Sequence, residues 1–274
     1  MNIKNAMTIA QKDWLEVRQN KSAMISMMIV PLIFIVFIPL LITLVLPMVS
    51  GGVESFTNDP DMQVFFSTMP EAMSRFLQGM DAKQVMIVTT LGYMFAPMFL
   101  IVPLMFSTTI AAESFAGEKE RKTLEALLYL PISDQELFTG KVMAAGLPAI
   151  AVTWMCFFLY TIIVNAIPYA SFGRLWFPLP VWWVLIFWVS PALIAVSISL
   201  TVMISIKVQT FMGAYQTSSA VVLIVVVFFI GQITGILFLS PLVALVMGVV
   251  FWVITAVIGR IAVHSFSRQK LLTN

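Results

Sequence analysis

The sequence predicts an all-helical integral membrane protein with six spanning helices. Of its 274 residues 60% are hydrophobic and 10% are charged, and its mean hydropathy is +1.00, whereas a soluble domain carries roughly 25% charged residues. The uncharged stretches are long enough to cross a bilayer, which takes about 20 residues. The whole chain, 1–274, is therefore expected to form one transmembrane domain.

The gaps between charged residues place the six spans. The region 218–259 has no charge and is long enough for two helices. Pro241, directly after Ser240, marks the break between them, because proline cannot continue a helix without the loss of a hydrogen bond. The expected spans are 23–49, 85–112, 142–167, 181–206, 218–239 and 241–263.

The lysines and arginines assign the orientation, because cytoplasmic connections carry an excess of these residues. With six spans both termini lie on one side. Three of the 15 lysines and arginines fall in connections on the other side, namely Arg75, Lys83 and Arg174. We therefore expect cytoplasmic termini, a cytoplasmic segment at 113–141 and an external loop at 50–84.

The first 22 residues indicate an amphipathic helix lying in the membrane interface. Apolar side chains recur every three or four residues, while most charges lie off this stripe. An ordinary cytosolic cap with a chance stripe is the alternative. The stripe consists of Ile3, Met7, Ala10, Trp14 and Val17, and the basic residues are Lys4, Lys12, Arg18 and Lys21.

The external loop contains the stretch "TMPEAMSRFLQG", which predicts a short helix. Thr68 and Glu71 have the spacing of a capping box, in which each residue bonds the backbone amide of the other. Gly79 is placed to end this helix.

The predicted spans contain no Asp, Glu, Lys, Arg or His in their interiors. Ion-gradient transporters usually need such groups, so this class is disfavoured. Intramembrane hydrolases need paired catalytic side chains, so we expect no enzyme. The single cysteine, Cys156, and the single histidine, His264, form no metal-binding group. Neutral polar residues such as Asn165 and Gln232 could line a pathway, but hydrogen bonds between helices are the favoured role. Pro97 and Pro103 predict a kinked second span.

The segment 113–141 has the densest charge in the chain. In "TLEALLYL" the leucines at 124, 127 and 128 share one helical face, and Pro131 ends that helix. Ser133 and Glu136 then form a capping box that starts a helix continuing into the third span. Anchoring of the second and third spans at the lipid headgroups could account for the charges, but not for the other features of the segment. The leucine face, proline stop and cap together favour a helical hairpin that docks on a partner.

The same segment resembles the cytoplasmic signature of the permeases of ABC type-2 transporters. In that family the pattern is approximately E-x-G-T-L-E-x-L-L-x-x-P-[ILV]-S, with G-K at the start of the third span. Lys122 stands where many members have glycine. The matching residues are Glu120, Thr123, Leu124, Glu125, Leu127, Leu128, Pro131, Ser133, Gly140 and Lys141.

The resemblance implies a non-catalytic permease subunit of an ABC exporter in a bacterial or archaeal plasma membrane. Two such chains, identical or similar, would pair with two cytosolic ATPase subunits, which bind ATP and magnesium, while this chain holds no cofactor. A net charge of +2 gives no reason to expect a nucleic-acid partner. The residues expected to couple to the ATPase are Glu118, Glu120, Arg121, Thr123, Leu124, Glu125, Leu127, Leu128, Pro131, Ser133, Gly140 and Lys141.

Two other classes of function stay open at this point. An ATP-independent secondary transporter or channel would carry substrate in liposomes that hold this chain alone. A membrane scaffold would bind an ATPase without any ATP-dependent flux. The sequence does not identify the transported substrate.

Overall fold

The computed structural model describes residues 3–48, 51–123, 133–208 and 210–265. These residues form helices and no strand, so the predicted all-helical class is confirmed. The six predicted spans are confirmed as well, because six helical stretches are long and apolar enough to cross a membrane. The stretches are Met27–Val45, Ala82–Glu120, Gln135–Ala166, Pro180–Lys207, Phe211–Ile233 and Pro241–Ala262.

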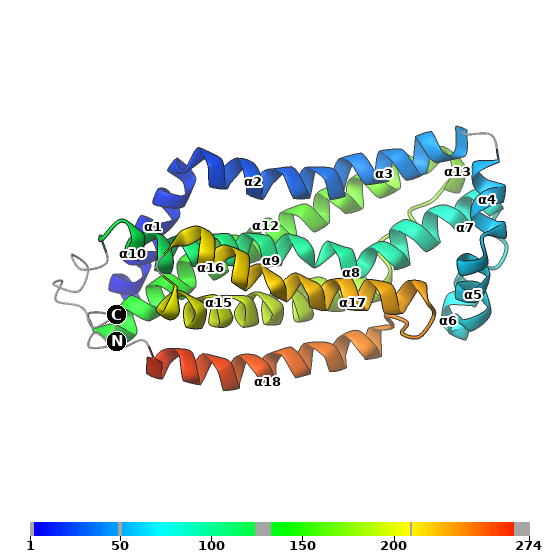
Figure 1. Cartoon of the computed structure of the whole chain (residues 1–274). Coiled ribbons are helices and arrows are strands. Elements are labelled where there is room, and N and C mark those ends of the chain that lie inside the picture. Colours follow the sequence, from blue (N-terminus) through cyan, green and yellow to red (C-terminus); the bar gives the residue numbers. More distant parts are fainter. Residues whose placement is uncertain (1–2, 49–50, 124–132, 209, 266–274) are drawn as a thin grey trace.

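The long helices run side by side in one elongated bundle (Figure 1). The first half of the chain contains α1 (Ile3–Gln19), α2 (Lys21–Leu32), η1 (Ile33–Phe37), α3 (Ile38–Leu40), η2 (Leu41–Val45), η3 (Leu46–Met48), α4 (Gly52–Asn58), α5 (Pro60–Thr68), α6 (Glu71–Leu77), α7 (Ala82–Ile87), η4 (Val88–Met94), α8 (Phe95–Phe99), α9 (Ile101–Ala112), η5 (Glu113–Gly117) and α10 (Glu118–Glu120).

The remaining elements complete the third to sixth spans. They are α12 (Asp134–Ala166), α13 (Tyr169–Phe172), α14 (Pro180–Val184), η6 (Leu185–Val189), α15 (Ser190–Lys207), α16 (Phe211–Ser218), η7 (Ser219–Val221), α17 (Val222–Ile233) and α18 (Pro241–Ser265). α1, α10 and the last turns of α18 lie at one end of the bundle, and α4 to α6 lie at the opposite end (Figure 1).

The second and fourth spans form the centre of the bundle, since most of their residues are buried, whereas a third or less of the residues of each other span are buried. The hydroxyls of Thr108 and Ser197 join these two spans by a hydrogen bond of 2.8 Å. This contact confirms the expected role for one pair of neutral polar residues.

The second span is irregular near the end that carries α4 to α6. Residues 88–94 form a π-helix, and the helix is interrupted at Leu100, between Pro97 and Pro103. Three consecutive carbonyls of this region accept hydrogen bonds from side chains of three other spans. Tyr160 donates to Leu91 at 2.8 Å, Trp182 to Gly92 at 2.7 Å and Gln232 to Tyr93 at 2.8 Å.

The bond to the Tyr93 carbonyl follows from the proline that interrupts this helix. Pro97 has no amide hydrogen to offer the carbonyl of Tyr93, four residues earlier. A backbone carbonyl left without a donor in an apolar medium costs several kcal/mol, roughly, so another helix must supply one. Gln232 does so for Tyr93.

The capping box predicted at Thr68 and Glu71 is wrong. α5 continues through Thr68, whose hydroxyl donates to the carbonyl of Val64 in the same helix at 2.7 Å. α6 begins after Pro70 and has no side-chain cap. A capping box does form at the next helix, where the amide of Gln84 donates to Asp81 at 2.7 Å.

Several spans differ in extent from their predicted bounds, the second and the fifth among them. The second continues beyond residue 112 to Glu120. The fifth begins at Phe211, because the Thr210 side chain accepts a hydrogen bond from the amide of Gly213 and caps that helix. It ends at Ile233, shortly before Gly235 turns the chain with a left-handed φ of 70°. The break before Pro241 lies where it was predicted.

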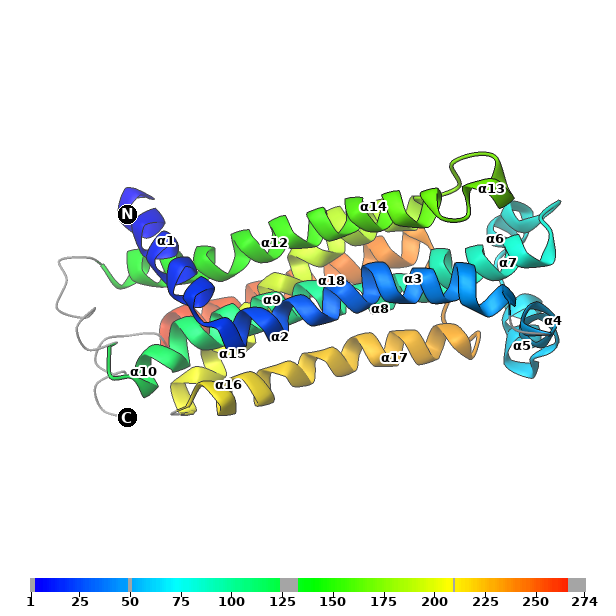
Figure 2. The ribbon, with the colours of Figure 1, turned by 90° about the horizontal axis from the view of Figure 1, so that it is seen from above.

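α1 lies across the end of the bundle and packs on α12 (Figure 2). Its buried side is rotated from the predicted stripe, since Ile3 and Met7 are 66% and 39% exposed. These two side chains point away from the protein and are available to lipid. The buried side is instead made by Ala6, Ile9, Ala10, Asp13 and Val17.

Gly140 is the point of closest approach between α12 and α1. A Cβ atom at this position would lie 2.8 Å from the carbonyl oxygen of Ala6 and 2.8 Å from the Cβ of Ile9. Gly146 lies further along the same helix. A Cβ atom there would have the Cδ1 atom of Ile198 as its nearest neighbour, at 3.6 Å.

We therefore expect opposite effects from the same substitution at two sites of one helix. Gly140→Ala should destabilise the protein by about 1–3 kcal/mol, because α1 must move away. Gly146→Ala should leave it unchanged or stabilise it by up to about 1 kcal/mol, because alanine favours the helix. Thermal unfolding in detergent measures both. Equal stability of the two variants would contradict the close packing of α1.

Candidate functional site

The predicted coupling residues fall into two groups in the structure. Leu124, Glu125, Leu127, Leu128 and Pro131 lie outside the described residues. The other seven flank that stretch on both sides, at the end of the bundle where α1 lies. They are Glu118, Glu120, Arg121, Thr123, Ser133, Gly140 and Lys141.

Lys141 joins three elements at the centre of this end. Its side chain is fully buried, and its ammonium group donates to the carbonyl of Ser114 at 2.5 Å and to the carboxylate of Glu118. It also lies 3.3 Å from the Asp13 carboxylate, which accepts a hydrogen bond from the Ser114 hydroxyl. α1, the end of the second span and the start of the third are thereby held together.

Lys12 closes the network from the surface side. Its ammonium group lies 2.5 Å from Glu118, 3.1 Å from Glu16 and 3.3 Å from Asp13. Burial by itself would lower the pKa of Lys12, but the hydrogen bond and charge of Glu118, with those of Asp13 and Glu16, raise it above its ordinary value. Lys12 is therefore charged throughout the physiological range. The buried Glu118 carboxylate thus lies between two ammonium groups.

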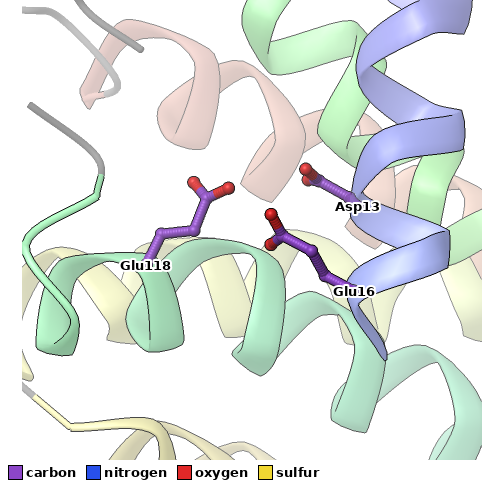
Figure 3. A group of neighbouring side chains, drawn as sticks. All are labelled: Asp13, Glu16 and Glu118. Carbon is purple, nitrogen blue, oxygen red and sulfur yellow. The ribbon is translucent and has the colours of Figure 1, made fainter. Parts of the chain in front are cut away.

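Three carboxylates converge here in the manner of a cation site. Figure 3 shows Asp13, Glu16 and Glu118 pointing toward one another from α1 and α10. One carboxylate oxygen of each lies within 4.8 Å of those of the other two. Lys12 Nζ approaches all three of them. A lysine ammonium therefore supplies the positive charge that such a group needs.

A second ion pair lies beside this network. Arg121 donates to Glu113 at 2.6 Å, and it also lies 4.0 Å from Glu16. Burial would lower the pKa of Arg121, but the hydrogen bond and charge of Glu113 raise it. Gly117 leaves the space for this buried carboxylate, because a Cβ there would lie 3.0 Å from the Glu113 Oε2 atom.

Lys119 and Glu120 connect the same turn to the fourth and fifth spans. Lys119 donates to the carbonyl of Ile206, in the last turn of α15, at 3.1 Å. Glu120 accepts a hydrogen bond from the amide of Phe211, the first residue of α16, at 2.7 Å. A cation at a helix C-terminus and an anion at a helix N-terminus both match the helix dipole. Two adjacent residues of opposite charge therefore hold the two ends of one connection.

Lys122 takes a left-handed conformation, with φ at 57°. The amide of Thr123 donates to the carbonyl of Glu118 at 3.0 Å, and the amide of Lys122 donates to that of Lys119 at 3.1 Å. These two bonds define a Schellman motif, which usually places glycine at the left-handed position. Because glycine adopts this conformation most easily, the turn accounts for the glycine that many members of the resembling family have where this chain has Lys122.

The third span begins as the sequence predicts. Ser133 and Glu136 form a capping box, with Ser133 accepting from the Glu136 amide at 3.2 Å. Asn5 of α1 donates to the same Glu136 side chain at 3.4 Å. α1 therefore contacts the start of the third span through Asn5, Gly140 and Lys141.

Sequence reasoning missed the α1 half of this site, along with Glu113 and Ser114. One signal was present, because Asp13 lies at helical spacing between Ala10 and Val17 on the apolar side of α1. A carboxylate there must be paired when buried, and the lysine of the G-K pair is its partner.

Comparison with known proteins gives one family. The family model described as "ABC-2 family transporter protein" matches residues 7–271 of the chain. No curated protein and no solved structure matches.

The geometry predicts unequal roles for the two lysines. Lys141→Met should destabilise the protein by about 3–5 kcal/mol, because Asp13 and Glu118 lose a fully buried partner. Lys12→Met, the matched control, should cost less, because that side chain is 37% exposed and Lys141 stays in place. Thermal unfolding in detergent tests this order, and adding Glu118→Gln to Lys141→Met should restore part of the loss. A Lys12→Met variant that is the less stable of the two would contradict it.

Lys122→Gly should stabilise the protein by about 1 kcal/mol, because a side chain in the left-handed region costs about that much. Lys122→Ala removes the same charge but keeps the Cβ atom, so it should give no such gain. Unfolding measurements on both variants separate backbone strain from charge. Equal gains in the two variants would show that the lysine charge, and not the backbone, is responsible.

Proposed function

The chain belongs to the ABC-2 family of transporter proteins, and from this we propose that it is the permease of an exporter driven by a separate cytosolic ATPase. A permease subunit of an ABC transporter that crosses the membrane several times follows from the family and the six apolar helices. The direction of transport and the coupling to the ATPase are the proposed part.

One observation supports the coupling most directly. Four consecutive residues, 118–121, make polar contacts with α1, α12, α15 and α16. These residues come directly before the predicted docking hairpin. A displacement of the hairpin would therefore reach α1 and the third, fourth and fifth spans through direct bonds.

The two legs of the hairpin are tied at its base. Glu118 on the leg that descends from the second span pairs with Lys141 on the leg that enters the third span. Neither side chain reaches the surface. Their part in coupling is to make both legs move as one body, whereas the exposed Glu120, Arg121 and Thr123 are available to a partner as well.

The mechanism follows from this arrangement. ATP, bound with magnesium by the partner subunits, closes the ATPase pair and shifts the grooves that hold the hairpin. The leucines at 124, 127 and 128 supply the apolar contact, and the flanking charges set its register. Two permease chains, identical or similar, rearrange together and open the pathway outward. This chain needs no cofactor of its own for such a step.

The docking contact is tested by Leu127→Asp with Leu128→Asp. The double variant should insert into the membrane normally but lose the ATPase on co-purification, because two charges replace the buried contact. The matched control is Leu175→Asp with Ile236→Asp, which changes two exposed apolar residues at the opposite end of the bundle. That control should retain the ATPase.

Retention of the ATPase by the Leu127 and Leu128 variant would overturn the docking proposal. Flux without ATP through liposomes that hold this chain alone would instead favour a secondary transporter or a channel.

A further inference from the structure

A cavity of about 370 Å³ lies at the end of the bundle opposite the ion-pair network. It forms between the end of α6 with the turn after it and the segment that follows α13, since residues of both line it. Its lining combines two arginines and one glutamine with apolar and aromatic side chains. The lining residues are Arg75, Phe76, Gln78, Arg174, Leu175 and Trp176.

The residues that line this cavity include two arginines and no acidic side chain. Two of the three basic residues on the predicted external side meet here, although they are far apart in the sequence. Arg75 pairs with Glu71 at 2.5 Å, one turn earlier on the same helix. Arg174 makes no hydrogen bond or ion pair with any described residue. A guanidinium group beside a second one favours an anion that both can bind.

The segment that carries Arg174 is held in place by buried hydrogen bonds. Asn165 accepts from the amides of Trp176 and Phe177 at 3.0 and 3.2 Å and donates to the Phe177 carbonyl at 2.8 Å. The Trp176 indole donates to Val164 and stacks on Phe172. Arg174 therefore projects from a fixed backbone, which lowers the entropy lost on binding.

The apolar side of the cavity indicates that the anion is part of an amphiphile. Leu175, next to Arg174, is 73% exposed, while Trp176 is 6% exposed and forms the buried wall. Tryptophan at the end of a span is typical of the headgroup region of a bilayer. An apolar chain can lie along Leu175 while the guanidinium groups hold a headgroup.

We propose that Arg174 and Arg75 bind the phosphate group of an anionic phospholipid from the outer leaflet, with Leu175 against its acyl chain. This site is independent of the ATPase coupling at the other end of the bundle. Bidentate hydrogen bonds from arginine to phosphate oxygens account for the choice of arginine over lysine.

The test uses the purified full chain and counts bound lipid by native mass spectrometry as phosphatidylglycerol or phosphatidylcholine is added. Arg174→Gln should weaken phosphatidylglycerol binding about tenfold, the loss of one charge-assisted contact. Arg174→Lys should recover part of it, and Arg75→Gln should weaken binding too. Lys83→Gln removes the third external basic residue, which does not line the cavity, and should bind like the wild type.

Phosphatidylcholine should bind more weakly, because its choline cation offsets the phosphate charge, and Arg174→Gln should weaken its binding less than that of phosphatidylglycerol. Because Arg174 is exposed and unpaired, the variant should unfold at the wild-type temperature, which separates lost binding from lost folding. Equal loss in Arg174→Gln and Lys83→Gln would overturn the proposal. So would displacement of the lipid by an equal concentration of inorganic phosphate, which would identify a site for free anions.

Discussion

The buried ammonium group of Lys141 holds one end of this bundle together. Removing a charge from water is costly, and the cost is offset here by the two carboxylates and the carbonyl that surround it. A buried ion pair adds little net stability compared with apolar packing, but it fixes geometry. Asp13 and Glu118 can be neutralised together only when α1, α10 and α12 adopt one relative position. Gly140 makes that position possible, because α1 crosses α12 where no side chain intervenes.

Lys141, Asp13 and Glu118 form a joint between α1, α10 and α12. The second span connects this joint to the rest of the molecule. At one end its final turn bonds α1 and three other spans through charged side chains. At the other end three of its carbonyls accept side-chain donors from the third, fourth and fifth spans. The third, fourth and fifth spans are therefore bonded to it at both ends. This arrangement gives the central span a direct physical path for a displacement that begins at the hairpin.

The sequence predicted the features that depend on local signals. The six spans follow from charge spacing, and Ser133 and Pro241 mark helix starts by chemistry confined to one turn. It could not predict the joint, because Lys12 and Asp13 find their partners 106 and 128 residues away. Thr68 failed as a cap because its own helix uses the hydroxyl first. The π-helix at 88–94 was also missed, since it is stabilised by donors from other spans.

The central claim is that the joint carries motion from the ATPase into the bundle. Hydrogen–deuterium exchange on the assembled transporter, with and without trapped ATP, tests it most directly. In the wild type, exchange should change in α1 and α16, which belong to this chain and not to the ATPase. In Glu118→Gln with Lys141→Met, the bound ATPase should still close, yet the change in α1 should be lost. The same change in α1 in wild type and variant would contradict the account.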